Sequence, residues 1–540
     1  MTFCFAAGAR GAVARSTAEL LLQRKACVLD AMALTHARVR DGLSAASRVR
    51  LDRLGELRRR IAEHAVSVQL FGAAADALDA GSLAELQAEE DRLQAELSHA
   101  GALNVGVGGG ALEPVGLQAV QAALPAGALL VEYLRWSVFD PVRSGHGAPW
   151  RGARYAAMVL RGRGAPHWFD LGPAEPIERA ADDLRTLLRD PDSDTGAARA
   201  AAIDVYRRLL APFEPLLARV TLLLVAPDGA LNLLPFGVLG APMLADRCIV
   251  CHLSSGRELL RAVLPSAPHA AVQVLVDADF DADDLPGVPA GEPERGAPPV
   301  SMPMQLDALP RTRDEAQLIE ALFAGCRVLA GAQASVAALQ AITQPALLHI
   351  ATHGWFRPVE ATAPVVKNQR LQIGDESLLL GRASRSAAAN PMLHAGLALA
   401  GANRSAPGRS SGFVTAAELA ALDLRGTELV VLSACDTGLG TTAPGSEFAG
   451  LRRAFAIAGA AAQVISLWSV DDAATAALMQ AFYRHLLAGS GRAEALQQAQ
   501  REVRRRPRWA HPSAWAAFAC WGAAGPLSDG LLAAAREARP

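Results

Sequence analysis

The chain has 540 residues, which at roughly 150 residues per domain predicts several domains with sizeable cores and excludes a peptide or a single small module. Hydrophobic residues make up 51% and charged residues 20%, and 52 basic against 54 acidic residues give a net charge of -2. This balance is typical of an ordinary globular protein and does not favour binding to nucleic acid. Seven scattered cysteines do not resemble a secreted disulfide framework, so we expect a cytoplasmic protein.

The apolar stretches of the chain predict neither a leader nor a membrane span. Residues 1–7 are too few for the core of a signal peptide, and no small-residue cleavage pattern follows them. The most apolar long stretch, residues 454–470, contains Gln463, Ser466 and Ser469 among many alanines and glycines. We therefore expect buried sheet and helix there, and no contact with a membrane.

The first 100 residues predict an all-α region. Apolar residues recur three or four positions apart, as in amphipathic helices, at Leu51, Leu54, Leu57 and Ile61 and again at Leu83, Leu86, Leu93 and Leu97. Glycines then break this pattern, so residues 101–128 are expected to form a Gly-rich linker. The helices could be the remainder of a helical-repeat array that is too short to stack alone.

Beyond residue 128, short apolar runs alternate with helical stretches, which predicts an α/β fold with a mostly parallel sheet. The predicted strands are residues 129–134, 155–160, 220–225, 271–276, 347–351, 429–433 and 462–467. The predicted helices include residues 177–189, 198–217 and 315–323, and Thr312 with Glu315 reads as a capping box for the last of them. Residues 281–310 and 358–411, rich in Pro and Gly, are expected to form long surface loops.

Two predicted strands end in residues whose side chains could take part in a reaction. One runs into His353 and Gly354, and the other delivers Cys435 into a turn of small residues. Ligands of open α/β sheets bind at the carboxyl ends of parallel strands, and a cysteine nucleophile needs a neighbouring base. A buried Cys or His taken singly is most often structural. Because both stand at strand ends, we expect them to lie side by side on adjacent parallel strands, with the N–H groups of Gly354 and Cys435 forming an oxyanion hole.

The sequence around these residues resembles the CHAT family, bacterial caspase-like domains related to separases and gingipains. The resemblance covers roughly residues 130–522, in motifs that follow one another in the family's order. These motifs are residues 226–236, 309–316, 349–356, 396–403, 429–440, 450–455, 466–472 and 511–518. The N-terminal helices are similar to the segment that joins tetratricopeptide repeats to such domains in longer relatives.

The resemblance implies a caspase-like α/β sandwich with a mostly parallel central sheet, preceded by the all-α N-terminal segment. It implies a non-catalytic first half at residues 129–307, a catalytic half at 308–525 and a tail at 526–540. It also implies a cysteine endopeptidase without a cofactor, in which His353 is the general base and acid, Cys435 the nucleophile and Gly354 an oxyanion donor. No third residue is needed to orient this dyad.

Three other features have two interpretations each. Cys248 and Cys251, followed by His252, have the spacing of a metal knuckle or redox pair, but no second pair exists and the segment reads as a strand, so we expect neither metal nor disulfide there. Asp471 and Asp472 precede a helix, where acidic residues are common as caps; in separases, an acidic residue of a similar run faces a basic P1 side chain. The arginine run at residues 501–508 is interpreted as a solvated helix end, without nucleic acid.

The sequence therefore predicts a cytoplasmic cysteine endopeptidase that cleaves a partner protein and is regulated by its N-terminal helices or by a protein partner. The alternative is a catalytically silent interaction or scaffold module of the same fold. The presence of His353, Gly354 and Cys435 together favours the enzyme, because a silent module has no chemical need for this set.

Overall fold

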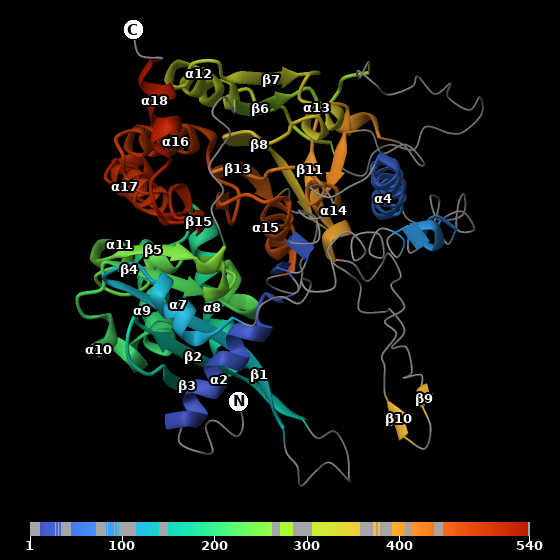
Figure 1. Ribbon diagram of the computed structural model, residues 1–540. Helices are drawn as coiled ribbons and strands as arrows, with labels where there is room; N and C mark the ends of the chain where they lie inside the picture. The colour runs from blue at the N-terminus through green and yellow to red at the C-terminus, as the bar shows by residue number, and fades with distance from the viewer. Residues whose placement is uncertain are drawn as a thin grey trace.

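A computed structural model gives the structure of the protein. It describes residues 11–27, 29–30, 32–33, 45–71, 83, 85–90, 92–93, 96, 115–139, 150–261, 271–283, 305–356, 371–373, 376–378, 391–405, 412–436 and 446–537. The dominant feature is a mixed, mostly parallel sheet of 13 strands that runs through both halves of the chain, with helices packed on it (Figure 1). The α/β fold and the N-terminal helices predicted from the sequence are confirmed.

The first half of the sheet is built around β1 (Ala128–Phe139). On one side β1 pairs with β2 (Trp150–Leu160), which pairs with β3 (His167–Pro173), both antiparallel. On the other side it is parallel to β4 (Leu222–Ala226), which is parallel to β5 (Ile249–His252). The helices of this half are α7 (Leu117–Ala123), α8 (Ala174–Arg189), α9 (Thr195–Leu209), α10 (Glu214–Leu217) and α11 (Leu244–Arg247).

The second half of the sheet is built around β8 (Leu347–Phe356), which lies parallel to both β6 (Val272–Ala278) and β13 (Leu429–Asp436). The remaining strands of this half are β7 (Arg327–Gly331), β11 (Ala395–Ala398), β12 (Phe413–Thr415), β14 (Ala462–Ser466) and β15 (Phe518–Gly522). Its helices are α12 (Thr312–Leu322), α13 (Val336–Gln340), α14 (Ala416–Leu419), α15 (Ser446–Ala458), α16 (Asp472–Leu487), α17 (Arg492–Arg504) and α18 (Asp529–Glu537). Strands β9 (Leu371–Ile373) and β10 (Glu376–Leu378) form a separate two-stranded sheet.

The two halves join where β15 pairs in parallel with β5, with Trp521 opposite His252. One hydrophobic cluster runs across this junction, from residues of β1 and α8 to residues of α16 and α17. Strand β6 lies before the division predicted at residue 307, yet it pairs with β8 and β7 of the second half. This pairing favours a division before β6, and the domain boundaries themselves stay predictions.

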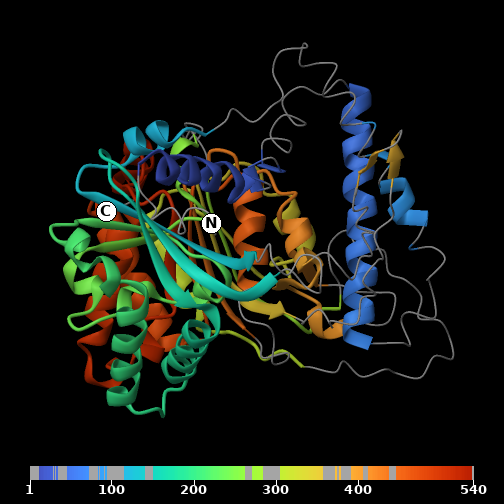
Figure 2. The ribbon, with the colours of Figure 1, turned by 90° about the horizontal axis from the view of Figure 1, so that it is seen from below.

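The N-terminal helices contact both halves. Helix α2 (Gly11–Arg24) lies on the first half, where its Ala14 carbonyl accepts a hydrogen bond from the Trp168 indole at 3.1 Å. Helix α4 (Ala45–Phe71) stands at the edge of the second half beside α14 (Figures 1 and 2). Leu57 and Ile61 of α4 are buried against Leu393. The predicted all-α region thus includes α2 and α4, docked on different halves, and the predicted linker contains α7; residues 101–114 lie outside the described residues.

Three local predictions are wrong. Residues 358–411 are not a surface loop throughout, because the buried strand β11 lies within them and pairs with β8. Thr312 and Glu315 do not form a capping box: the Thr312 hydroxyl donates to the Leu309 carbonyl at 2.7 Å, and the Glu315 carboxylate bonds His349. The helix predicted at residues 198–217 ends at Leu209, and a short 3-10 turn at Ala211–Phe213 separates it from α10. Among the residues that the structure describes, no helix is long and apolar enough to cross a membrane.

Candidate active site

His353 and Cys435 occupy partner positions on neighbouring parallel strands. Strands β8 and β13 stay in register from Leu347 opposite Leu429 to Gly354 opposite Asp436, and Cys435 is the partner of His353. Both strands are apolar up to this point, with Ile350 and Leu432 buried, because they cross the core before they reach its edge. The predicted placement at the carboxyl ends of adjacent parallel strands is thus observed in the backbone. The side chain of Cys435 and residues 437–445 lie outside the described residues.

The opposite edge of β8 changes partner just before His353. Strand β6 pairs with β8 only as far as Ile350, and the antiparallel β11 then takes its place, with Ala398 opposite His353. Within β11, Gly396 comes so close to the Trp355 indole and the Val414 carbonyl that an added Cβ would collide with both. A side chain at position 396 would therefore push β11 away from the site.

The His353 imidazole is held on two sides. Its Nε2 lies 2.8 Å from the Asp307 carbonyl oxygen, and the centroid of its ring lies 5.2 Å from that of Phe280. A carbonyl oxygen can only accept a hydrogen bond, so Nε2 carries the proton in the neutral ring and Nδ1 keeps a lone pair. Nδ1 is buried and has no hydrogen-bond partner among the described residues. The ring therefore presents Nδ1 as a proton acceptor, the property that a general base needs.

A second histidine of β8 has a structural role that the sequence did not reveal. His349 is fully buried, and its Nδ1 and Nε2 lie 2.9 Å from the Tyr483 hydroxyl and from a Glu315 carboxylate oxygen, respectively. These contacts tie β8 to α12 and α16, four residues before His353 on the same strand. Glu315 belongs to the motif at residues 309–316. A charged residue at a buried helix position needs a polar partner, and this was the signal in the sequence that could have indicated the contact with His349.

The two candidate aspartates differ in their contacts. Asp471 is exposed and caps α16, since its carboxylate accepts the Ala474 N–H at 2.9 Å. Asp472 is half-buried at the first position of the helix and makes no side-chain hydrogen bond or ion pair within the described ranges. The preceding Trp468 is buried and its indole donates to the Ser513 carbonyl at 3.2 Å, which joins the motif at residues 466–472 to that at 511–518. The capping interpretation thus holds for Asp471.

The CxxC segment contains buried thiols. Cys251 is fully buried on β5, and its Sγ lies 4.0 Å from Sγ of Cys520 on β15, whereas Cys248 precedes the strand. Burial raises the pKa of Cys248 to about 11, and the hydrogen bond with Cys520 together with burial raises the pKa of Cys251 well above its ordinary value, which disfavours both thiolates. Within the described part of the chain, no group of three His, Cys, Asp or Glu side chains is arranged to hold a metal ion.

The arginine run packs on aromatic rings and a carboxylate. Arg504 pairs with Asp246, and Arg501 donates to the Ala245 carbonyl. Arg508 lies over the Trp509 ring at 3.7 Å from its centroid. Each of these contacts engages an arginine within the protein, consistent with the interpretation of a helix end.

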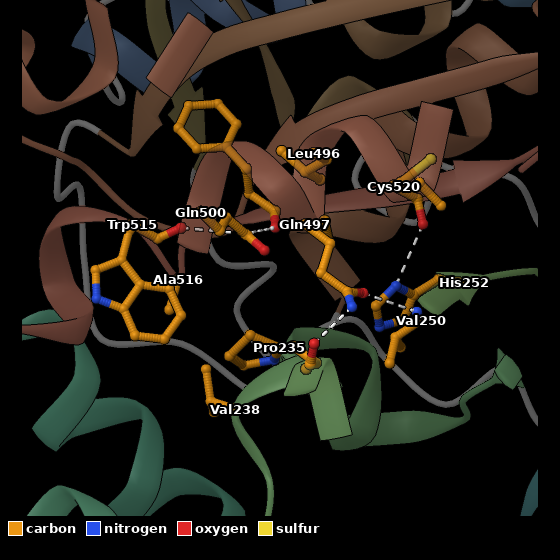
Figure 3. A pocket seen from close by; sticks show the side chains of 15 residues that line it. Pro235, Val238, Val250, His252, Leu496, Gln497, Gln500, Trp515, Ala516 and Cys520 are labelled. Atoms are coloured by element: carbon orange, nitrogen blue, oxygen red, sulfur yellow. Dashed lines mark hydrogen bonds between the residues drawn. The ribbon is translucent and has the colours of Figure 1, made fainter. Parts of the chain in front are cut away.

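A small pocket lies at the junction of the two halves, away from His353 (Figure 3). Pro235 and Val238 line one side and Gln497 and Trp515 the other, with His252 at its end. Its volume of about 30 Å³ leaves room for water. Burial lowers the pKa of His252 to about 4, so this imidazole is neutral near pH 7.

Residues 199–523, more than half of the chain, match the CHAT domain family. The chain belongs to the CHAT family. Membership supports the caspase-like cysteine-peptidase fold that the sequence predicted for this CHAT protein.

Two curated relatives of the CHAT protein are tetratricopeptide repeat protein 28 of Mus musculus and of Homo sapiens. Both are 29% identical to it, over 234 and 221 residues, which is 40% and 39% of this chain. The matches span 8% of the length of each relative.

Solved structures similar to the CHAT protein include the Arg-specific cysteine proteinase gingipain R and the Saccharomyces cerevisiae separase–securin complex. Each shares 9% sequence identity with it, with TM-scores of 0.32 and 0.35. The first similarity covers 66% of this chain and 76% of the other, and the second covers 75% and 30%.

Proposed function

We propose that this CHAT protein is a cysteine endopeptidase that uses His353 and Cys435 as a dyad. The observation that carries the proposal is the register of β8 and β13, which makes these two residues direct partners at the carboxyl ends of parallel strands. The second support is the imidazole itself, whose Nε2 faces a carbonyl while Nδ1 is buried without a partner among the described residues. Both features are what a thiol–imidazole pair requires.

In the proposed reaction, Nδ1 of His353 takes the thiol proton of Cys435, and the thiolate attacks the carbonyl carbon of the scissile peptide. The tetrahedral intermediate collapses when the imidazolium returns its proton to the leaving amine, which leaves a thioester. Water, activated by the same nitrogen, hydrolyses this acyl-enzyme. As the family resemblance implies, backbone N–H groups of Gly354 and Cys435 would stabilise the oxyanion.

For substrate selection we propose that Asp472 faces a basic P1 side chain. Asp471 is engaged as the cap of α16, whereas Asp472 makes no side-chain hydrogen bond or ion pair within the described residues. The amino end of α16 follows β14, which lies next to β13, so the carboxylate is on the element adjacent to the proposed nucleophile's strand. A carboxylate selects Lys or Arg, because pairing offsets the desolvation of both charges.

The natural substrate is proposed to be a protein, and the N-terminal helices are proposed to receive a regulatory protein partner. Both α2 and α4 are docked on the CHAT domain, one on each half, so a partner that displaced either helix would act directly on the domain. The cytoplasmic location stays a prediction from the sequence.

The test is cleavage of a proteome-derived peptide library by the full-length chain, followed by kinetics on the best substrate. Cys435→Ala and His353→Ala should each lower kcat/KM by at least about 10³-fold, since nucleophile and base act as a unit. Cys326→Ala and His485→Ala, away from the site, serve as matched controls and should keep activity. Cleavage that survives Cys435→Ala would refute the dyad.

A second readout covers the case of a weakly active chain. Iodoacetamide should alkylate Cys435 faster than Cys326, whose pKa burial raises to about 12, and His353→Ala should slow the reaction at Cys435. No cleavage together with an unreactive Cys435 would favour the silent scaffold module.

A further inference from the structure

The two groups that hold His353 come from opposite ends of one stretch of chain. Phe280 lies just after β6 where the chain leaves the sheet, and Asp307 lies where the chain returns before α12. Residues 284–304 between them lie outside the described residues. The His353 imidazole makes one hydrogen bond within the described structure, to the Asp307 carbonyl. Something else must therefore fix these two chain ends relative to each other and to β8.

Asn403 joins both ends. Its side-chain oxygen accepts the Leu306 N–H at 2.9 Å, and its Nδ2 donates to the Leu306 carbonyl at 3.0 Å, a two-point pairing with the returning segment. The same Nδ2 lies 3.2 Å from a carboxylate oxygen of Asp281, and the Asn403 N–H donates to the Phe280 carbonyl at 2.9 Å, which engages the departing segment. One residue thus bonds to the chain on both sides of residues 284–304.

The position of Asn403 is fixed by the sheet beside the site. β11 pairs with β8 at His353, and Gly401 then turns the chain with a left-handed φ of +82°, which a glycine adopts without strain. Asn403 follows in the short 3-10 turn Ala402–Arg404. Only an amide offers an acceptor and donors at adjacent atoms, so Asp, Ser or Ala cannot reproduce the pairing with Leu306.

We propose that Asn403 is a positioning residue for His353. Its hydrogen bonds join Phe280 and Asp281 to Leu306 and so place the Asp307 carbonyl against Nε2. This carbonyl holds the imidazole in the tautomer with Nδ1 unprotonated. The tautomer part of this inference stands without the proposed peptidase activity; its kinetic part rests on that function. The residue belongs to the motif at residues 396–403, to which the sequence alone assigned no role.

The test compares Asn403→Ala and Asn403→Asp with Asn232→Ala. Asn232 is the matched control, since it is also half-buried in a 3-10 turn and donates to a backbone carbonyl, of Gly229 at 2.9 Å. ¹⁵N NMR of selectively histidine-labelled protein reports the tautomer of each imidazole, and His353→Gln assigns the relevant signal. The wild-type chain and Asn232→Ala should show Nε2–H, and both Asn403 variants a mixture of tautomers.

Kinetics separate positioning from general stability. With folding verified by circular dichroism, the Asn403 variants should lower kcat about 10- to 100-fold with little change in KM, because substrate contacts are unchanged while the base is misplaced. Asn403→Asp keeps the size of the side chain and removes its donors, so it decides the matter if Asn403→Ala does not fold. A pure Nε2–H tautomer and unchanged kcat in a folded Asn403 variant would overturn the inference. If the Asn403 variants change the tautomer of His353 but the wild-type chain cleaves no substrate, the positioning role of Asn403 is supported and the proposed function is refuted.

Discussion

At the scale of single residues, the chemistry of His353 depends on atoms that no motif names. The group that fixes its tautomer is the main-chain carbonyl of Asp307, 46 positions away, and the neighbouring ring is that of Phe280. A carbonyl is present at every residue, so a sequence pattern cannot indicate which one will accept a hydrogen bond. Likewise, the capping box predicted from Thr312 and Glu315 is wrong, because the Glu315 carboxylate forms a buried hydrogen bond with His349 and does not bond the start of its own helix.

Neutralising the two aspartates at the start of α16 should have different effects. Asp472→Asn should lower kcat/KM for a substrate with Arg or Lys at P1 by about 10²- to 10⁴-fold, because a desolvated cation would lose its counter-charge. Asp471→Asn should change it little, since Asn caps a helix as well as Asp does. Steady-state kinetics on matched peptides measures both. Equal activity of the two variants, or a preference for an acidic P1 residue, would refute the proposal that Asp472 faces a basic P1 side chain.

At the scale of elements, α2 is attached to the first half by buried charges. Lys25 follows α2, and its ammonium donates to the Glu132 carboxylate at 2.9 Å and to the carbonyls of Tyr133 and Ala226 at 2.8 and 2.7 Å. Arg257, also buried, bonds Asp30 and the Leu22 carbonyl at the end of the helix. Contacts of this kind attach α2 firmly to the first half of the sheet.

Removing the Lys25 ammonium should destabilise the protein and loosen α2. In Lys25→Met the fully buried Glu132 carboxylate loses its counter-ion, which typically costs about 3–5 kcal/mol. Arg179→Met, which breaks the exposed pair with Glu175, should cost under about 1 kcal/mol. Chemical denaturation measures both, and Lys25→Met combined with Glu132→Gln should recover part of the loss. Similar stabilities for the two single variants would contradict this account.

The buried carboxyl of Glu418 on α14 should make stability depend on pH. Burial raises the pKa of Glu418, on α14, to about 7 from an ordinary value near 4.5. Its contribution to stability is therefore fully present below the unfolded-state pKa and is lost as the pH rises through about 7. Between pH 6 and 8 the wild type should lose roughly 1 kcal/mol more than Glu418→Gln, which cannot ionise. Urea denaturation at both pH values measures this, with the exposed Glu175→Gln as control; parallel pH profiles for wild type and Glu418→Gln would exclude it.

At the scale of the whole molecule, the two halves share one sheet and one of the hydrophobic clusters. The junction consists of a parallel pair of strands with Trp521 over His252, at 4.8 Å between ring centroids, and Arg452 of α15 lies over the same indole at 4.3 Å. Because one hydrophobic cluster draws residues from both halves, the unfolding of either half would expose part of it.

Both halves should therefore unfold together. The slowest-exchanging amides of β1 and of β13 should report opening free energies within about 1 kcal/mol of each other in native-state hydrogen exchange. Trp521→Ala, which removes a large buried side chain at the junction, should lower both values by about the same amount. A decrease confined to one half, or two well-separated exchange classes, would show that the halves are independent units.

The sequence by itself indicated part of the elements, among them the strands β8 and β13, and it predicted His353 and Cys435 as partners of the candidate dyad. Continuous apolar runs indicated these strands, because a strand that is buried on both faces is apolar throughout. His353 and Cys435 follow two such runs, so they were predicted at the carboxyl ends of strands. Only the tertiary structure decided that β6 belongs beside β8, that the N-terminal helices dock separately on the two halves, and that Asn403 clasps the chain at His353. These are contacts between segments tens to hundreds of residues apart, and local periodicity carries no information about them.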